Sequence, residues 1–368
     1  MALEELARPH ILELKPYQPG KPVEELEREL GISGAVKLAS NENPLGPSPR
    51  ALAAMRQKLE EMNRYPDGAA WELRAKLAER FRVEPGQFVF GCGGDEVLEL
   101  LAKSFLSPGD EVVYAWPSFA MYPIVVAGMG AASVQVSLGD DLAHDLPAMS
   151  RAVTPRTKMV VLCNPNNPTG TSFGHEAFDA FVASLPSDLI LVVDEVYIEF
   201  ARRDDFPDTL KLLATRPGTI SIRSFSKLYG LAGLRIGYGI CDPELAAILE
   251  RARHPFNVSR LAEVAAVAAL EDTAHVEATL KFNHEGAEWL ARELTALGVE
   301  VWPTDTNFVL IRTEETGAEI YEGLLREGLI VRPLPGTGLD HHIRVTIGTP
   351  KENEQLVRGL RKLLERSH

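Results

Sequence analysis

The chain has 368 residues, too many for one ordinary domain, so a large domain with a smaller partner is expected. Hydrophobic residues make up 45% of the chain and charged residues 24%, which is typical of a folded globular protein and excludes a disordered one. The 38 basic and 52 acidic residues give a net charge of −14, and no stripe of Lys and Arg could follow a phosphate backbone, so nucleic acid is not an expected partner.

The first residues, MALEELARPH, contain neither the basic region nor the apolar region of a secretory signal peptide. No apolar run in the chain reaches the roughly 20 residues that span a bilayer. We therefore expect a cytoplasmic protein without a membrane partner.

Between about residues 86 and 255, short apolar runs alternate with helical patterns, such as those at 96–105, 175–185 and 243–253. This alternation predicts an α/β fold with a mostly parallel sheet covered by helices. Seven strands are predicted, at 88–90, 111–115, 132–136, 159–163, 189–193, 219–222 and 236–240.

The last hundred residues differ, because a long Ala/Leu/Glu-rich helical region at 260–297 precedes strands at 299–302, 308–311 and 342–346 and a final helix at 352–366. This order predicts a small α+β domain. We expect an N-terminal arm that joins the small domain over residues 1–40, a large domain over 41–275 and the small C-terminal domain over 276–368.

Metal binding and disulfides are not indicated. Cys92, Cys163 and Cys241 are odd in number, far apart and never paired as CxxC. The nine His residues show no HExxH spacing. The cysteines are therefore interpreted as small buried side chains near strand ends.

Polar residues follow several predicted strands, at the edge where ligands bind to open parallel sheets. The turn GCGGDE at 91–96 opens a helix and offers backbone N–H groups to an anion, although such a turn alone is a weak signal. The strand at 189–193 runs into DEVY, and the strand at 219–222 runs into SFSK and then AGLR. An acid, a lysine and an arginine thus follow strands that are expected to be neighbours.

The sequence SFSK with AGLRIGY downstream, preceded by DEVY and NNPTG, resembles the fold-type-I aminotransferases that use pyridoxal 5′-phosphate. Within that superfamily the segments SNENPLGP, RYPD and CNPNNPTG are most similar to the histidinol-phosphate aminotransferase family. The resemblance covers nearly the whole chain. It implies a fold-type-I transferase in which a large seven-stranded domain carries the cofactor beside a small α+β domain.

The resemblance assigns Lys227 as the residue that forms a Schiff base with pyridoxal phosphate and later carries the proton during catalysis. Asp194 would lie opposite the pyridine nitrogen and keep it protonated, so that the ring withdraws electrons. Tyr197 and Asn167 would donate to the 3′-oxygen of the ring, and Phe119 would stack on it.

The cofactor phosphate would be held by backbone N–H groups, hydroxyls and a guanidinium fork. By resemblance these belong to Gly94, Asp95, Ser224, Ser226 and Arg235. Tyr65 of a second subunit would also reach the phosphate, which implies a homodimer with shared active sites.

Substrate binding in an aminotransferase needs a group that holds a carboxylate, and Arg is the usual one. Arg344 matches this family position, and Arg332 would join it in holding the phosphate of histidinol phosphate or a carboxylate of glutamate. Tyr17, Asn43 and Asn307 would line the pocket. The implied reaction is ping-pong amino transfer from L-histidinol phosphate to 2-oxoglutarate, in histidine biosynthesis.

Three other functions are weighed against this one. A phosphothreonine decarboxylase of cobalamin synthesis shares the overall frame and also binds a phosphorylated amine. Aromatic amino acids are alternative substrates, because pocket shape cannot be inferred from one sequence. A cofactor-binding transcription regulator would need a winged-helix domain ahead of SNENPLGP, which begins at residue 40, so this alternative is not expected.

Overall fold

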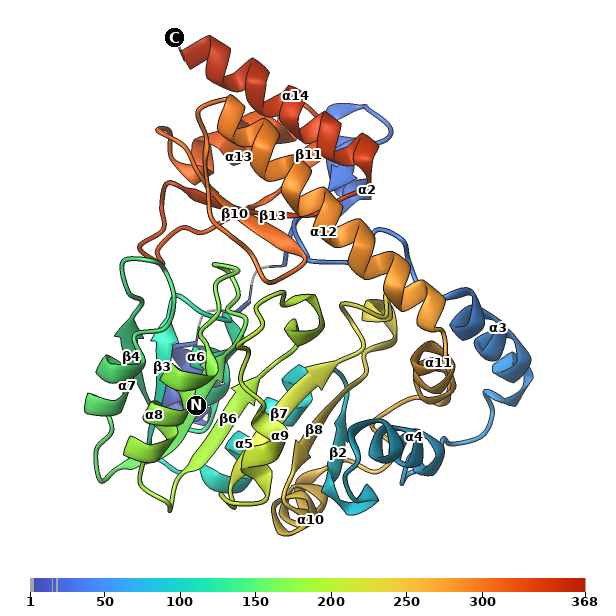
Figure 1. Cartoon of the computed structure of the whole chain (residues 1–368), viewed down its shortest axis with the longest axis vertical. Coiled ribbons are helices and arrows are strands. Elements are labelled where there is room, and N and C mark those ends of the chain that lie inside the picture. Colours follow the sequence, from blue (N-terminus) through green and yellow to red (C-terminus); the bar gives the residue numbers. More distant parts are fainter. Residues whose placement is uncertain (1–2, 15, 18, 368) are drawn as a thin grey trace.

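The computed structural model describes residues 3–14, 16–17 and 19–367, and the arm predicted at 1–40 therefore includes four positions outside the described residues. Figure 1 shows two units, a large one built on a wide sheet and a smaller one stacked on one end of it. The helix α12 (Thr273–Ala296) runs from one unit to the other.

The large unit contains the predicted seven-stranded sheet, in the order β2-β8-β7-β6-β5-β3-β4. All pairs are parallel except those of β8, which is antiparallel to both of its neighbours. The prediction of a mostly parallel sheet is thus confirmed. The strands are β2 (Phe88–Gly91), β3 (Glu111–Trp116), β4 (Ala132–Ser137), β5 (Thr157–Cys163), β6 (Ile190–Asp194), β7 (Thr219–Ser224) and β8 (Gly237–Cys241).

Both faces of the sheet are covered, which explains why its central strands are continuous apolar runs. Alternate side chains of one strand point to opposite faces, so Val192 packs on one side while Leu191 and Val193 pack on the other. The first face carries α5 (Gly94–Phe105), α6 (Met121–Gly128) and α10 (Pro243–Ala252). The second carries α3 (Pro49–Lys58), α4 (Trp71–Phe81), α7 (Leu146–Arg151), α8 (His175–Ser184), α9 (Thr209–Leu213) and α11 (Arg260–Leu270).

The helical region predicted at 260–297 is interrupted, and it forms α11 and α12. The break lies at Glu271 and Asp272, where the Asp272 carboxylate accepts a hydrogen bond from the backbone N–H of His275 at 3.3 Å. Asp is a favoured residue before the first turn of a helix, because its side chain satisfies an N–H group that has no partner within the helix. At this turn the chain changes direction, and α12 then runs from the large unit to the small one.

The small unit is built on an antiparallel sheet in the order β12-β13-β10-β9. These strands are β9 (Glu300–Val301), β10 (Phe308–Arg312), β12 (Arg332–Pro333) and β13 (His342–Thr346). They pack against α12, α13 (Gly317–Arg326) and α14 (Pro350–Ser367). The N-terminal segment adds β1 (Val36–Lys37), which pairs in parallel with β11 (Leu329–Ile330), and α2 (Val23–Leu30).

Shorter helical segments complete the described chain. They are η1 (Leu3–Glu5), α1 (Pro9–Leu12), η2 (Leu59–Glu61), η3 (Pro85–Gln87), η4 (Ile198–Phe200) and η5 (Ala232–Leu234). The helix α1 lies beside α6 (Figure 1).

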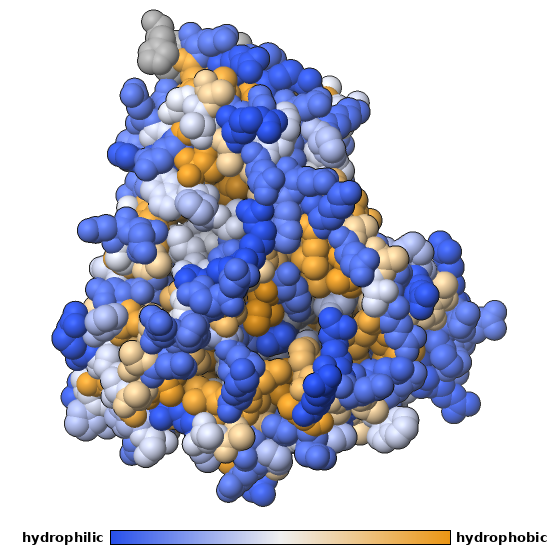
Figure 2. Space-filling model, in the orientation of Figure 1, coloured by the Kyte–Doolittle hydropathy of each residue, from blue (hydrophilic) through white to orange (hydrophobic). Residues whose placement is uncertain are grey.

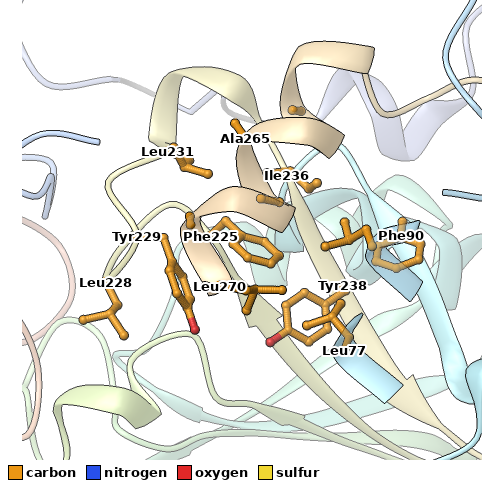
Figure 3. Close-up of a cluster of buried hydrophobic side chains, with 14 of the residues drawn as sticks. Leu77, Phe90, Phe225, Leu228, Tyr229, Leu231, Ile236, Tyr238, Ala265 and Leu270 are labelled. Atoms are coloured by element: carbon orange, nitrogen blue, oxygen red, sulfur yellow. The ribbon is translucent and has the colours of Figure 1, made fainter. Parts of the chain in front are cut away.

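The surface in Figure 2 is mostly hydrophilic, with apolar residues in small groups between the polar ones. Among the described residues, no helix is both long and apolar enough to cross a membrane. The main core beneath the sheet is shown in Figure 3, where Phe225, Leu228 and Tyr229 pack with Tyr238 and Leu270. The segment that follows β7 is thus anchored in the core by apolar side chains.

Candidate active site

A cavity of about 230 Å³ opens at the carboxyl ends of the parallel strands, where the sequence placed the site. Most of the predicted site residues line it, although they come from distant parts of the chain. These are Tyr17, Gly94, Asp95, Phe119, Asn167, Asp194, Tyr197, Ser224, Ser226, Lys227, Arg235 and Arg344.

Lys227 lies three residues beyond the end of β7 and is held there by its buried neighbours Phe225 and Leu228 (Figure 3). Its ammonium group lies 5.5 Å from the centre of the Tyr197 ring. Burial, assisted by the positive charge of Arg344, lowers the pKa of Lys227 to about 8. A lysine with this pKa is partly neutral near physiological pH, as a nucleophilic amine must be.

Asp194 ends β6 and is 3% exposed. One carboxylate oxygen accepts a hydrogen bond from the Tyr122 hydroxyl at 2.7 Å, and the other accepts one from the backbone N–H of Val196 at 3.3 Å. Burial raises the pKa of Asp194 to about 6. A buried carboxylate is suited to a cationic partner in the cavity. Such a partner would offset the free-energy cost of burying the carboxylate charge.

Tyr197 and Asn167 each accept a hydrogen bond from a side chain that comes from another part of the chain. The Asn41 side chain donates to the Tyr197 hydroxyl at 2.8 Å. Arg344 donates to the Asn167 side chain at 2.5 Å and to the backbone oxygen of Ala39 at 2.6 Å. Asn41 was not predicted, although it lies within SNENPLGP, because one sequence does not show which Asn of the segment points inward.

One end of the cavity is suited to an anion. The helix α5 begins at Gly94, so its first N–H groups face the cavity, and the Arg235 guanidinium lies beside them and donates to Asp95 at 2.9 Å. Gly93 has a φ of +82°, and a Cβ atom there would lie only 2.3 Å from an Arg235 nitrogen. A side chain at this position would displace the guanidinium, so glycine is required.

A second hollow of about 360 Å³ adjoins the first and shares Tyr17, Phe119, Asn167 and Arg344 with it. Arg332 lines this hollow, with its guanidinium carbon 5.5 Å from the centre of the Tyr17 ring. Within the described part of the chain, the buried Nε–H of Arg344 has no hydrogen-bond partner. It is therefore available to an anion. The hollow is also lined by Lys21, Trp116 and Tyr321, which were not predicted.

Three predicted residues lie outside these two hollows. Asn43 donates to the backbone oxygen of Leu228 at 2.9 Å, next to Lys227. Asn307 donates to the backbone oxygen of Asn41 at 2.9 Å, so it supports the site from behind. Tyr65 is 77% exposed and stacks on Phe256, with ring centres 4.7 Å apart.

The cavity fits pyridoxal 5′-phosphate at three points. A lysine of lowered pKa can anchor the aldehyde, a buried carboxylate can pair with the ring nitrogen, and a glycine-lined helix start with Arg235 can hold the phosphate. These features, on a mostly parallel seven-stranded sheet, define a fold-type-I pyridoxal-phosphate enzyme.

Comparison with known proteins specifies the family. The family described as aminotransferase class I and II matches residues 33–360, so the chain belongs to it. The chain is 47% identical over 363 residues to histidinol-phosphate aminotransferase 2 of Pseudomonas fluorescens (strain Pf0-1), covering 98% of both chains. It is 44% identical to the histidinol-phosphate aminotransferase of Moorella thermoacetica, covering 97% of this chain and 92% of the relative.

Solved structures show the same likeness. The crystal structure of histidinol-phosphate aminotransferase from Sinorhizobium meliloti, in complex with pyridoxal 5′-phosphate, has a TM-score of 0.90 and 31% identity, covering 98% of both chains. The predictions of a class I/II aminotransferase fold and of the pyridoxal-phosphate cofactor are therefore confirmed.

Proposed function

We propose that this aminotransferase transfers the amino group of L-histidinol phosphate to 2-oxoglutarate, giving imidazole-acetol phosphate and L-glutamate in histidine biosynthesis. The observation that carries the proposal is the pair Arg332 and Arg344, which line one hollow beside the Lys227 cavity. Two guanidinium forks suit a dianionic phosphate ester in one half of the cycle and a dicarboxylate in the other. Relatives that are 44–47% identical carry this activity in their names.

The cofactor, when bound, supplies an aldehyde carbon for the amine and a protonated ring that withdraws electrons from the substrate Cα. Lys227 would anchor it, and the Nζ of Lys227, once free, would be the base that moves a proton at the substrate Cα. Asp194 would pair with the ring nitrogen and keep it protonated. Tyr197 and Asn167 would hydrogen-bond the 3′-oxygen, and Phe119 would stack on the ring.

The phosphate of the cofactor would be held by the first N–H groups of α5, the hydroxyls of Ser224 and Ser226, and Arg235. Gly93 leaves the space that the guanidinium occupies. Arg344 holds an anionic group of every substrate, and Arg332 adds a second fork at the outer end of the hollow. These contacts orient the substrate amine toward Lys227.

The substrate assignment is tested by single-turnover reactions of the loaded enzyme with one amine at a time. Histidinol phosphate and glutamate should each discharge the cofactor absorbance rapidly, whereas phenylalanine, tyrosine and aspartate should react more slowly. Carbon dioxide release from phosphothreonine would indicate a decarboxylase instead. Rapid turnover of phenylalanine with none of histidinol phosphate would contradict the proposed substrate.

We also propose a homodimer in which Tyr65 completes the partner's site. Tyr65 is 77% exposed, and the side chains of Met62, Trp71 and Phe256 are 44%, 71% and 43% exposed. Large apolar residues this exposed are typical of a surface that is covered by another chain.

The test mixes two inactive variants, Lys227→Ala and Tyr65→Ala. If sites are shared, each mixed dimer has one site with both native residues, and activity should recover to about a quarter of the wild-type value under random pairing. No recovery in mixtures whose subunit exchange is verified would contradict shared sites. Sedimentation of the wild type as a fully active monomer would contradict the dimer itself.

A further inference from the structure

Tyr122 is a fully buried tyrosine that no predicted role includes. It lies in the first turn of α6, three residues after Phe119, and its backbone N–H donates to the Phe119 oxygen at 3.1 Å. The two rings meet edge to face, with centres 5.7 Å apart. The Tyr122 side chain is 2% exposed. The Tyr122 ring therefore packs against Phe119, which lines the cavity, while its hydroxyl reaches Asp194 at the end of β6.

The Tyr122 hydroxyl donates to Asp194 at 2.7 Å, the only side-chain hydrogen bond that this carboxylate accepts within the described residues. The remaining hydrogen bond, from the backbone N–H of Val196, is longer at 3.3 Å. A hydrogen bond to a charged group in a buried setting is strong and directional. The phenol thus restricts the rotation of the carboxylate, which lines the cavity.

A phenol is well suited to this position. Burial and the charge of Asp194 raise the pKa of Tyr122 well above its ordinary value, so the hydroxyl keeps its proton and acts as a donor. The same hydrogen bond lowers the pKa of Asp194, against the larger effect of burial. Tyr122 therefore favours the ionised carboxylate, which is the form that can pair with a protonated ring nitrogen.

We propose that Tyr122 is a positioning residue that acts on the cofactor through Asp194, by holding the carboxylate in the orientation that pairs with the pyridine nitrogen. The inference rests on the cofactor of the proposed function but not on its substrate. Binding of the cofactor to the full-length apoprotein therefore tests it without any catalytic turnover.

The experiment measures the dissociation constants of pyridoxal phosphate and of its 1-deaza analogue, in which a C–H group replaces the ring nitrogen. Tyr122→Phe keeps the ring and removes only the hydroxyl. Because it removes a hydrogen bond to a charged group, pyridoxal phosphate should bind about tenfold or more weakly. The deaza analogue cannot pair with Asp194, so its affinity should change by less than about twofold.

Tyr114→Phe is the matched control. Tyr114 is also buried, and its ring lies 5.7 Å from that of Tyr122, but its hydroxyl accepts a hydrogen bond from Gln135 and does not contact Asp194. Its removal should leave both dissociation constants unchanged. A second background, Asp194→Asn, should reduce the effect of Tyr122→Phe on pyridoxal phosphate, because the acceptor is then neutral.

Three outcomes are decisive. Selective weakening of pyridoxal phosphate by Tyr122→Phe supports the proposal. Unchanged binding, or equal weakening of both ligands, would overturn it, since the phenol would then have no role or only a structural one. If the wild type itself failed to bind pyridoxal phosphate, the proposed function would be at fault.

Discussion

The floor of the active site and its outer rim are built in different ways. We define the floor as Tyr122, Asp194 and Tyr197, whose side chains are at most 3% exposed and joined to neighbours by hydrogen bonds. The rim consists of Tyr17, which is 47% exposed, and Arg332, whose guanidinium lies over the Tyr17 ring. Lys227 and Arg344 line the same cavity as Asp194, Tyr197 and Tyr17.

This difference follows from what each region binds. Buried polar groups must be paired, and their interactions are stronger in a low dielectric, so under the proposed function the floor would hold one cofactor in one orientation. The rim remains in contact with water, where a charge can exchange partners at little cost. An enzyme that accepts two different anions in alternate half-reactions requires a rigid floor and an adaptable rim.

The largest expected effect comes from Lys227→Ala. The variant loses both the covalent anchor and the proton carrier, so amino transfer should fall by about 10⁴-fold or more while the fold is retained. Borohydride reduction and peptide mapping of the wild type should place the pyridoxyl group on Lys227. A pyridoxyl group on another lysine would contradict the assignment of Lys227, and the contrast between floor and rim around that residue would no longer apply.

Arg344→Ala should have the next largest effect. It removes charge-assisted hydrogen bonds from an enclosed site, each worth about 1.5–3 kcal/mol, so kcat/KM should fall about ten- to a hundredfold for every substrate. The measurement is single-turnover kinetics with histidinol phosphate, glutamate and phenylalanine. If kcat/KM fell for one substrate only, Arg344 would discriminate between substrates, as is expected of Arg332 in the rim.

Arg332→Ala should be selective. Histidinol phosphate should lose about tenfold or more in kcat/KM, glutamate less, and phenylalanine, if it is a substrate, least, because only the dianionic ester engages both forks. Arg332→Lys, which keeps the charge but loses the fork, should lie between the wild type and the Ala variant. Equal losses for all three amines would show that Arg332 does not discriminate phosphate.

The smallest effect concerns pH. The pKa of Lys227 is lowered to about 8, and its ammonium form cannot attack an aldehyde, so reconstitution of the apoprotein with pyridoxal phosphate should accelerate as pH rises to about 8 and then level off. Because the positive charge of Arg344 contributes to this lowering, Arg344→Gln should move the midpoint to higher pH. Arg332→Gln serves as the control. Equal midpoints in all three proteins would show that Arg344 and Lys227 are not coupled.

Lys227 also links folding to pH. Its pKa is about 8 in the folded chain and near 10.5 in an unfolded one, so the unfolded chain binds more protons between these values. Burial of this ammonium group therefore lowers the free energy of unfolding by its full amount below pH 8. This destabilisation disappears as pH rises toward 10.5. Unfolding of the apoprotein in denaturant, compared with Lys227→Met across this range, would detect the difference.

The sequence predicts the site best where strands lead directly into polar loops. Asp194 and Lys227 were found because each follows an apolar run of strand length, and the carboxyl ends of neighbouring parallel strands meet at one edge. Tyr122 was missed because its hydroxyl lies in an apolar helix, MYPIVVAG, where a tyrosine is normally interpreted as core packing. Its role depends on the distance between α6 and β6, which no local pattern encodes.

The parallel sheet and the polar strand ends could be predicted from the chain's own pattern, because apolar periodicity and motif spacing are local properties, whereas the roles of the cofactor-site residues came from the family resemblance. Which polar groups meet depends on the folded arrangement of the whole chain. It brought Asn41 to Tyr197, Tyr122 to Asp194 and Arg344 to Asn167, and it placed Asn43 and Asn307 behind the cavity. The physical reason is that hydrogen bonds between distant segments depend on how whole units pack, and buried polar groups then find partners by proximity in space.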